Sequence, residues 1–264
     1  MSDPTVLYEE LGAVAVATLN RPQSLNSFTR QMHYDLWAVL DRAEANPAIR
    51  ALVVTGAGRA FCAGADLSEF DFAPGPDSVA RADPSPIIEE AFNPTVRRLQ
   101  ALRMPTIAAV NGVAAGAGAS LTMTCDIAIA APGASFIQAF SKIGLVPDAG
   151  GSWFLAQRLG LARAMALAMT GDKLTAIQAR DWGMIWDVAD DCLAAATALA
   201  QRLAAMPTQA LVATRTILRE SSSRTLEQQL QVERDTQSAM GKTQDYIEGV
   251  KAFLEKRAPK FTGQ

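Results

Sequence analysis

An aspartate in an apolar, glycine-rich segment is the residue of this chain best suited to acid–base chemistry. Asp148 stands in Val-Pro-Asp-Ala-Gly-Gly, residues 146–151, directly before a helix that we predict over residues 150–159. Its carboxylate could cap the N-terminus of that helix, which is the commoner role of such a residue. If apolar neighbours bury the carboxylate instead, desolvation raises its pKa and makes Asp148 a usable general base near neutral pH. The residues alone leave both roles open.

Two glycine-rich segments offer backbone N–H groups as a second chemical tool. Gly56-Ala-Gly58 and Gly116-Ala-Gly118 begin like dinucleotide fingerprints. Phe61 and Leu121 occupy their third glycine positions, which excludes a Rossmann loop. We place both segments at strand-to-helix junctions, where free N–H groups attract negative charge. One N–H from each segment, aimed at one point, would form an oxyanion hole. Tight packing of small residues is the alternative explanation.

Other catalytic classes find little support in the residue types. A serine or cysteine nucleophile needs an imidazole beside it, and His33 is the only histidine. We predict that His33 lies on one face of a helix over residues 30–45, where its ring is structural. Without a histidine cluster, no transition-metal site is predicted. The three cysteines show neither a zinc spacing nor a disulfide framework, which favours a reducing cytoplasm.

Composition excludes further classes of protein. The 24 lysines and arginines against 27 aspartates and glutamates give a net charge of −3, and no basic cluster suits a nucleic-acid partner. With 49% hydrophobic and 19% charged residues, the chain is globular. Residues 104–125 carry no charge, but Pro105, Asn111 and many small residues argue against a membrane span. Residues 1–10 show no basic, apolar leader, so we expect a cytoplasmic protein.

Hydrophobic periodicity predicts an α/β core over residues 1–190 and a helical region over residues 191–264. The first strand pair should form a hairpin, and strand-helix-strand order then occurs twice. Residues 71–85 hold three prolines without periodicity, which predicts a mobile surface loop. Thr175 and Thr225 each match a capping box and mark helix starts. The predicted core strands are residues 5–9, 13–19, 51–55, 106–110, 127–131 and 184–189; the predicted helices are 30–45, 86–102, 116–124, 150–159, 193–205, 208–219, 225–240 and 243–256.

The two glycine-rich segments and the Asp148 segment, together with the motifs given at the end of this paragraph, resemble the enoyl-CoA hydratase/isomerase (crotonase) superfamily over nearly the whole chain. The resemblance implies a spiral of ββα units with a helical C-terminal region that forms a homotrimer or a dimer of trimers. It also implies an acyl-CoA substrate, with coenzyme A as part of the thioester and no prosthetic group. The motifs are Leu19-Asn-Arg-Pro22, Leu25-Asn26, Ala60-Phe-Cys-Ala-Gly-Ala-Asp-Leu67, Ala109-Val-Asn-Gly-Val-Ala-Ala-Gly-Ala-Gly118, Cys125-Asp126 and Gly144-Leu-Val-Pro-Asp-Ala-Gly-Gly151.

The same resemblance assigns roles to individual positions. The backbone N–H groups that hold the thioester oxygen map onto Ala65 and Ala117. Ala117 replaces the more usual glycine, which a backbone donor tolerates. Coenzyme A is held in the family largely by main-chain groups of two loops, which correspond here to Gln23, Ser24, Leu25, Ala63, Ala65, Asp66 and Leu67.

Departures from the hydratase pattern narrow the expected reaction. Hydratases of the family use two glutamates to activate water, and those positions hold Ser120 and Phe140. A hydroxyl and a phenyl ring cannot act together as general acid and general base on a water molecule. Asp148 occupies the place where several isomerase branches carry their acid–base carboxylate. Phe140, with Ser120, Phe136 and Trp153, is expected to line a substrate pocket, and core packing is the alternative for the aromatic residues.

Segments outside the shared motifs resemble one branch, the isomerases of 1,2-epoxyphenylacetyl-CoA in phenylacetate breakdown. Enzymes of this branch convert the ring epoxide to the oxepin and are thought to shift double bonds in unsaturated thioesters. An enoyl-CoA hydratase, a thioesterase-like or dehalogenase-like branch, and a non-catalytic acyl-CoA-binding protein remain the alternatives. The matching segments are Asn93-Pro94, Arg97-Arg-Leu99, Phe140-Ser-Lys-Ile-Gly-Leu145, Trp182-Gly-Met-Ile-Trp186, Glu233-Arg-Asp235 and Lys260-Phe-Thr-Gly263.

Overall fold

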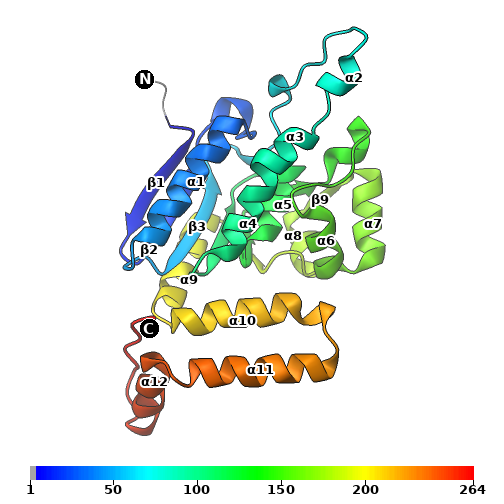
Figure 1. Ribbon diagram of the computed structural model, residues 1–264. Coiled ribbons are helices and arrows are strands. Elements are labelled where there is room, and N and C mark those ends of the chain that lie inside the picture. Colours follow the sequence, from blue (N-terminus) through cyan, green and yellow to red (C-terminus); the bar gives the residue numbers. More distant parts are fainter. Residues whose placement is uncertain (1–3) are drawn as a thin grey trace.

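The computed structural model describes residues 4–264. No leader is predicted in residues 1–10, and the first three of these residues lie outside the described part of the chain. Six strands form the larger sheet in the order β1-β2-β3-β5-β7-β10. Figure 1 shows β1, β2 and β3 side by side at one edge of this sheet. β1 and β2 form the predicted antiparallel hairpin, and the other neighbours pair in parallel. The strands are β1 (Val6–Leu11), β2 (Val14–Leu19), β3 (Ala51–Gly56), β5 (Thr106–Val110), β7 (Ile127–Ala130) and β10 (Asp187–Val188).

Four short strands form a second sheet in the order β4-β6-β8-β9. β4, β6 and β8 pair in parallel, whereas β9 runs antiparallel to β8. Three successive strand pairs each place their first strand in the larger sheet and their second strand in the smaller sheet, and a helix follows each pair. The pairs are β3-β4, β5-β6 and β7-β8. The predicted spiral of ββα units is therefore confirmed. The strands of this sheet are β4 (Ala60–Cys62), β6 (Val113–Ala115), β8 (Ser135–Ile137) and β9 (Lys173–Thr175).

Helices cover both faces of the larger sheet. Thr29 caps α1 as predicted, because its hydroxyl accepts a hydrogen bond from the Met32 backbone. Alternate strand residues, Ala15 and Ala17, face the α1 side, whereas Val14 and Val16 pack with α9. α9 lies after residue 190 and packs against the sheet of the core. The division of the chain into a core over residues 1–190 and a helical region over residues 191–264 stays a prediction. The helices of the core are α1 (Arg30–Ala45), α4 (Asn93–Ala101), α5 (Ala117–Thr124), α6 (Gly151–Leu159), α7 (Leu161–Thr170), α8 (Ala176–Asp181) and α9 (Cys192–Ala204).

The last three helices form a C-terminal arm, residues 208–264, which lies beneath the core in Figure 1. They are α10 (Thr208–Glu220), α11 (Leu226–Met240) and α12 (Gln244–Leu254). The predicted capping box at Thr225 is present, as is the one at Thr175 before α8. Arg219 of α10 reaches back to the core, with Nη2 2.8 Å from Asp126 Oδ1. This ion pair fixes α10 against the sheet.

Four segments differ from the sequence-based predictions. The loop over residues 71–85 contains one turn of helix, α2 (Ser78–Arg81). The helix predicted over residues 86–102 begins at α3 (Ser85–Ile87) and widens into a π-helical turn, Ile88–Phe92, before α4. The strand predicted over residues 184–189 is reduced to β10. Gly56-Ala-Gly58 leads from β3 into β4 rather than into a helix, so its predicted junction is wrong.

Short 3-10 segments complete the chain at Pro22–Ser24, Leu67–Glu69, Ala139–Ile143 and Ser221–Ser223. Among residues 4–264, no helix combines the length and the hydropathy that a membrane span requires.

Candidate active site

Asp148 lies in the turn that leads into α6, and its side chain does not cap that helix. Gly150 occupies the N-cap position, and α6 has no side-chain cap. The Asp148 carboxylate is half-buried, and its Oδ1 atom has no hydrogen-bond partner. Burial raises the pKa of the Asp148 carboxyl to about 6, although a hydrogen bond with its own backbone opposes the shift. Of the two roles left open by the sequence, the geometry suits the general base.

The turn that carries Asp148 has an unusual backbone. Ala149 adopts a left-handed conformation with φ of 49°, and Gly150 follows with φ of 75°. A left-handed conformation costs an alanine about 1–2 kcal/mol. Such strain persists only where the surroundings hold it, and it often marks functional turns.

The loops that carry Ala65 and Ala117 meet at two glycines. A Cβ atom at Gly64, whose φ is +97°, would lie 2.9 Å from the Ala115 carbonyl oxygen and 3.5 Å from the Ala117 nitrogen. A Cβ atom at Gly116 would lie 4.0 Å from the Gly64 Cα atom. The 2.9 Å distance is too short for a side chain, so residue 64 must be a glycine for the loops to approach in this way. The two backbone segments to which the family resemblance assigns the oxyanion hole, those of Ala65 and Ala117, are therefore adjacent.

Hydrogen bonds on both sides of Ala65 fix its loop. The Phe28 backbone donates to the Gly64 carbonyl at 2.7 Å and accepts from the Asp66 N–H at 2.8 Å. The Ala65 N–H between them has no protein acceptor within residues 4–264, and the same holds for the Ala117 N–H at the start of α5. Both amides are therefore available to a ligand oxygen.

The two loops predicted to hold coenzyme A lie against each other. The Ala63 N–H donates to the Leu25 carbonyl oxygen at 3.0 Å. Leu25 and Asn26 both have positive φ, and the buried Asn26 amide donates to the carbonyl oxygens of Ala57 and, at 2.8 Å, of Ala60 at the start of β4. The hydrogen bonds by which Asn26 joins the two segments were not predicted from the sequence. Leu-Asn at residues 25–26 was their only sequence signal.

Asp66 is the one charged group among the predicted coenzyme A contacts, and its side chain is already paired. Arg21 Nη2 lies 2.8 Å from Asp66 Oδ2, and Ser68 donates to the other oxygen. Burial acts to raise its pKa, but the hydrogen bonds from Ser68 and Arg21 outweigh it and lower the pKa of Asp66 to about 2. The carboxylate of Asp66 is therefore already engaged within the protein. Gln23, Ser24 and Leu67 lie on the same two loops, in or beside the short 3-10 turns.

The four residues predicted to line the pocket divide into two groups. Phe140 is buried, and a Cβ atom at Gly116 would lie 3.6 Å from its ring, which places the ring against the start of α5. Ser120 lies one turn into α5, and its hydroxyl faces the Asp148 backbone. Phe136 instead lines a small internal cavity with Gln138 and core side chains. Trp153 packs edge-on against Phe154 and remains 46% exposed.

His33 has the structural role expected from the sequence, but one of its two ring nitrogens has no hydrogen-bond partner. Its Nδ1 atom lies 2.8 Å from Thr95 Oγ1, which also accepts from Trp37 and donates to the Ala91 carbonyl. The histidine must therefore carry its hydrogen on Nδ1, which leaves the buried Nε2 atom without a partner. Burial lowers the pKa of His33 to about 3.

Metal-ligating side chains do not gather in the part of the chain that the structure describes. No group of three or more histidine, cysteine, aspartate or glutamate residues there could hold a metal ion.

Known proteins share both the sequence and the fold. A family profile for enoyl-CoA hydratase/isomerase matches residues 9–264. A 1,2-epoxyphenylacetyl-CoA isomerase of Escherichia coli (strain K12) is 50% identical over 254 residues, or 95% of each chain. A probable enoyl-CoA hydratase of Rhodobacter capsulatus is 40% identical over the full length of both chains. The crystal structure of an enoyl-CoA hydratase from Polaromonas sp. JS666 superposes with a TM-score of 0.89 at 35% identity, covering 97% of this chain and 99% of that chain. The chain belongs to the enoyl-CoA hydratase/isomerase (crotonase) family.

Proposed function

We propose that this enzyme is an acyl-CoA isomerase that uses Asp148 as its single acid–base group. Its substrate is 1,2-epoxyphenylacetyl-CoA, converted to oxepin-CoA, or a 3-enoyl-CoA thioester, whose double bond it shifts, or both. The half-buried Asp148 carboxylate with an unpartnered oxygen is the observation that carries this proposal. A carboxyl pKa of about 6 suits a group that must both accept and return a proton near neutral pH.

In the proposed mechanism, the Ala65 and Ala117 amides bind the thioester oxygen. They stabilise the enolate that forms when a proton leaves the α-carbon, a contribution worth about 3–4 kcal/mol per donor in comparable sites. Asp148 takes this proton and returns it to the γ-carbon of a 3-enoyl thioester, so the double bond moves and no atom is gained or lost. The coenzyme A portion lies along the main-chain groups of residues 23–25 and 63–67.

Residues at the two hydratase positions support isomerisation over water addition. Ser120 is fully buried, with its hydroxyl 3.0 Å from the Asp148 carbonyl oxygen, and Phe140 presents a ring beside Gly116. Neither side chain can activate water as a glutamate does. The identity of 50% to the isomerase of Escherichia coli also favours this reaction. Enoyl-CoA hydratase is the second candidate, because relatives such as the Rhodobacter capsulatus protein carry that name.

A side-by-side assay of the purified protein tests the proposal. With a 3-enoyl-CoA, isomerisation creates a conjugated thioester and its absorbance. With a 2-enoyl-CoA, hydration removes that absorbance. Fast migration with negligible hydration is expected, and conversion of 1,2-epoxyphenylacetyl-CoA is then followed by chromatography of the CoA products. Fast hydration would favour the second candidate, and binding without turnover of any thioester would favour a non-catalytic acyl-CoA-binding protein.

The Asp148→Asn variant tests the role of the base itself. It should lose most isomerisation and keep its affinity for the acyl-CoA, because amide and carboxyl groups have similar shapes. Unchanged turnover in this variant would reject the assigned role.

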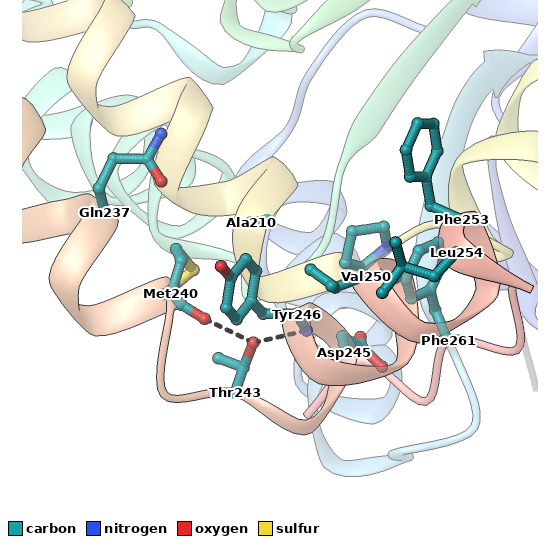
Figure 2. Close-up of a pocket in the computed structure, with 12 residues that line it drawn as sticks. Ala210, Gln237, Met240, Thr243, Asp245, Tyr246, Val250, Phe253, Leu254 and Phe261 are labelled. Atoms are coloured by element: carbon teal, nitrogen blue, oxygen red, sulfur yellow. Dashed lines mark hydrogen bonds between the residues drawn. The ribbon is translucent and has the colours of Figure 1, made fainter.

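We further propose that the chain assembles as a homotrimer or a dimer of trimers through its C-terminal arm, in the cytoplasm. No residue of α11 is buried, and Phe253 of α12 is 82% exposed. Figure 2 shows a groove on the arm between α10, α11 and α12, where apolar side chains such as Tyr246 and Val250 remain uncovered. Contact with another copy would bury this surface.

Light scattering after size-exclusion chromatography measures the assembly. The expected mass is three or six times that of the chain. A Phe253→Glu variant should shift the mass towards the monomer, since a charge at an apolar interface is costly. Replacing Glu227, also on the arm, by glutamine is the matched control. A monomeric wild-type protein would contradict the proposal.

A further inference from the structure

Ser120 connects helix α5 to the turn that carries Asp148. Its Oγ atom lies 3.0 Å from the Asp148 carbonyl oxygen, nearer than the 3.4 Å to the Gly116 carbonyl of its own helix. Ser120 is completely buried, so water does not compete for this hydrogen bond. The same Asp148 carbonyl accepts a second hydrogen bond, from the Gly151 N–H at 2.7 Å. Two donors from different elements therefore hold one carbonyl.

Close packing accompanies this hydrogen bond. A Cβ atom at Gly151 would lie 2.4 Å from Ser120 Oγ but 3.5 Å from Ser120 Cβ. The first distance is a clash, whereas the second is an ordinary contact between carbon atoms. The hydroxyl of Ser120 thus fills the space that the missing side chain of Gly151 leaves open. No other part of residue 120 comes so close.

The position of Ser120 in its helix gives the contact a further consequence. Ala117 begins α5, and Ser120 follows it three residues later in the same first turn, where its N–H donates to the Gly116 carbonyl at 3.1 Å. The turn on the other side of the contact has the strained Ala149 backbone. Ser120 is therefore the hydrogen-bonded link between the Ala117 amide and the segment that carries the carboxylate.

We propose that Ser120 is a positioning residue, whose hydroxyl holds the Asp148 turn against α5 and so fixes the carboxylate relative to the Ala117 amide. This inference rests on the proposed function and adds to it a role for the side chain at one hydratase position. The hydroxyl acts on the backbone of residue 148 and takes no part in proton transfer. Without it, the strained turn relaxes, the distance between base and amide is no longer fixed, and water reaches the carboxylate.

The first experiment compares Ser120→Ala with Thr122→Ala in the isomerase assay. Thr122 is a matched control, because it lies on the same helix, is equally buried and donates its hydroxyl to Ala119 within the helix. Ser120→Ala should lower kcat about 10-fold or more with little change in KM, as expected when a reacting group is misplaced. Thr122→Ala should keep the wild-type kcat.

The pH profile separates positioning from a general loss of stability. Better access of water should move the acid limb of the Ser120→Ala profile below that of the wild-type enzyme, towards the usual range of an aspartate. No charged side chain contributes to the pKa of Asp148, so burial is what the variant changes. An unchanged kcat and acid limb in Ser120→Ala would overturn the proposal.

A double-mutant cycle tests the contact itself. Gly151→Ala alone should be strongly impaired, because its Cβ atom meets the Ser120 hydroxyl. In the Ser120→Ala background the same substitution meets only the Cβ atoms of residue 120 at 3.5 Å and Pro147 at 3.6 Å, which are ordinary contacts, so it should cause little further loss. Independent effects of the two substitutions would contradict the assigned contact.

The two proposals fail in different ways. If Asp148→Asn retains full activity, the base is wrongly assigned whatever Ser120 does. If Asp148→Asn is inactive and Ser120→Ala is fully active with an unchanged pH profile, Asp148 is the base and only the positioning role of Ser120 is wrong.

Discussion

The backbone of Gly64 approaches the Ala117 amide so closely that a Cβ atom at residue 64 would lie 3.5 Å from the Ala117 nitrogen. The same atom would lie 2.9 Å from the Ala115 carbonyl oxygen, and the φ of +97° disfavours any side chain. This contact places the loop of the first proposed oxyanion donor against the second.

Gly64→Ala should consequently separate the two donors. Loss of one oxyanion donor typically lowers kcat about 10²–10³-fold, and we expect a decrease of that order in the isomerase assay. Gly133→Ala is the control, since a Cβ atom there meets nothing within 4 Å. It should leave kcat unchanged. Wild-type kcat in Gly64→Ala would contradict the assignment of the Ala65 amide.

The pH dependence of isomerisation should follow the ionisation of Asp148. The base must be deprotonated, and burial raises its pKa to about 6. kcat/KM should therefore be constant above this value and fall about tenfold per pH unit below it. Rates measured from about pH 4.5 to about pH 8 test this. An acid limb near the ordinary aspartate pKa of about 4 would contradict the buried state of the carboxylate.

Asp148→Asn should stabilise the protein while it removes activity. Above about pH 6 the folded state holds a buried charge that the unfolded chain exposes to water, so a neutral amide should raise the free energy of unfolding by about 1–3 kcal/mol. The gain should shrink as the pH falls from about 6 towards 4, where the folded carboxyl is already protonated. Urea unfolding at about pH 7.5 and pH 4.5, at one protein concentration, measures both values. Equal stability of the two proteins at about pH 7.5 would count against a desolvated carboxylate.

His33 should contribute a loss of stability in acid. Its folded pKa is lowered to about 3 from 6.5, so between these values the unfolded chain binds a proton that the folded state refuses. Stability is fully present above about pH 6.5 and decreases by about 1.4 kcal/mol per pH unit as the pH falls. His33→Phe keeps a ring beside Phe28 and should show a shallower dependence.

A second substitution controls for the loss of the histidine hydrogen bond. Thr95→Val deletes the partner of Nδ1 but retains the imidazole, so it should keep the wild-type slope. Unfolding free energies at about pH 6.5 and pH 4.5 give each slope. Identical slopes for wild type and His33→Phe would mean that carboxylates alone cause the acid sensitivity.

Regular elements with a strong local signal could be predicted from the sequence. The α1 helix begins and ends where its apolar period and Thr29 indicate, and both capping boxes form. β4 has only three residues, too few to show alternation, so the prediction of a strand-to-helix junction at Gly56-Ala-Gly58 is wrong. The π-helical turn at Ile88–Phe92 has the composition of an ordinary helix and could not be distinguished from one.

The candidate site also contains residues that local sequence patterns predict and contacts that they do not. Asp148 and the two amides could be located because motifs carry them, but the partner of Ser120 lies 28 residues away along the chain. No local pattern reports a hydrogen bond between a buried hydroxyl and a distant carbonyl. Phe136 and Phe140 are both buried, and only their packing partners, a core cavity and Gly116, tell them apart.

The smaller sheet determines how this enzyme could change its chemistry. The proposed functional groups follow three of its parallel strands: Ala65 comes after β4, Ala117 after β6 and Asp148 after β8. Each turn of the spiral thus contributes one group to the proposed reaction centre. Two of these groups are backbone amides, which every substitution except proline retains. A different reaction on the same thioester therefore requires new side chains on the later turns only, while the polarising amides stay in place.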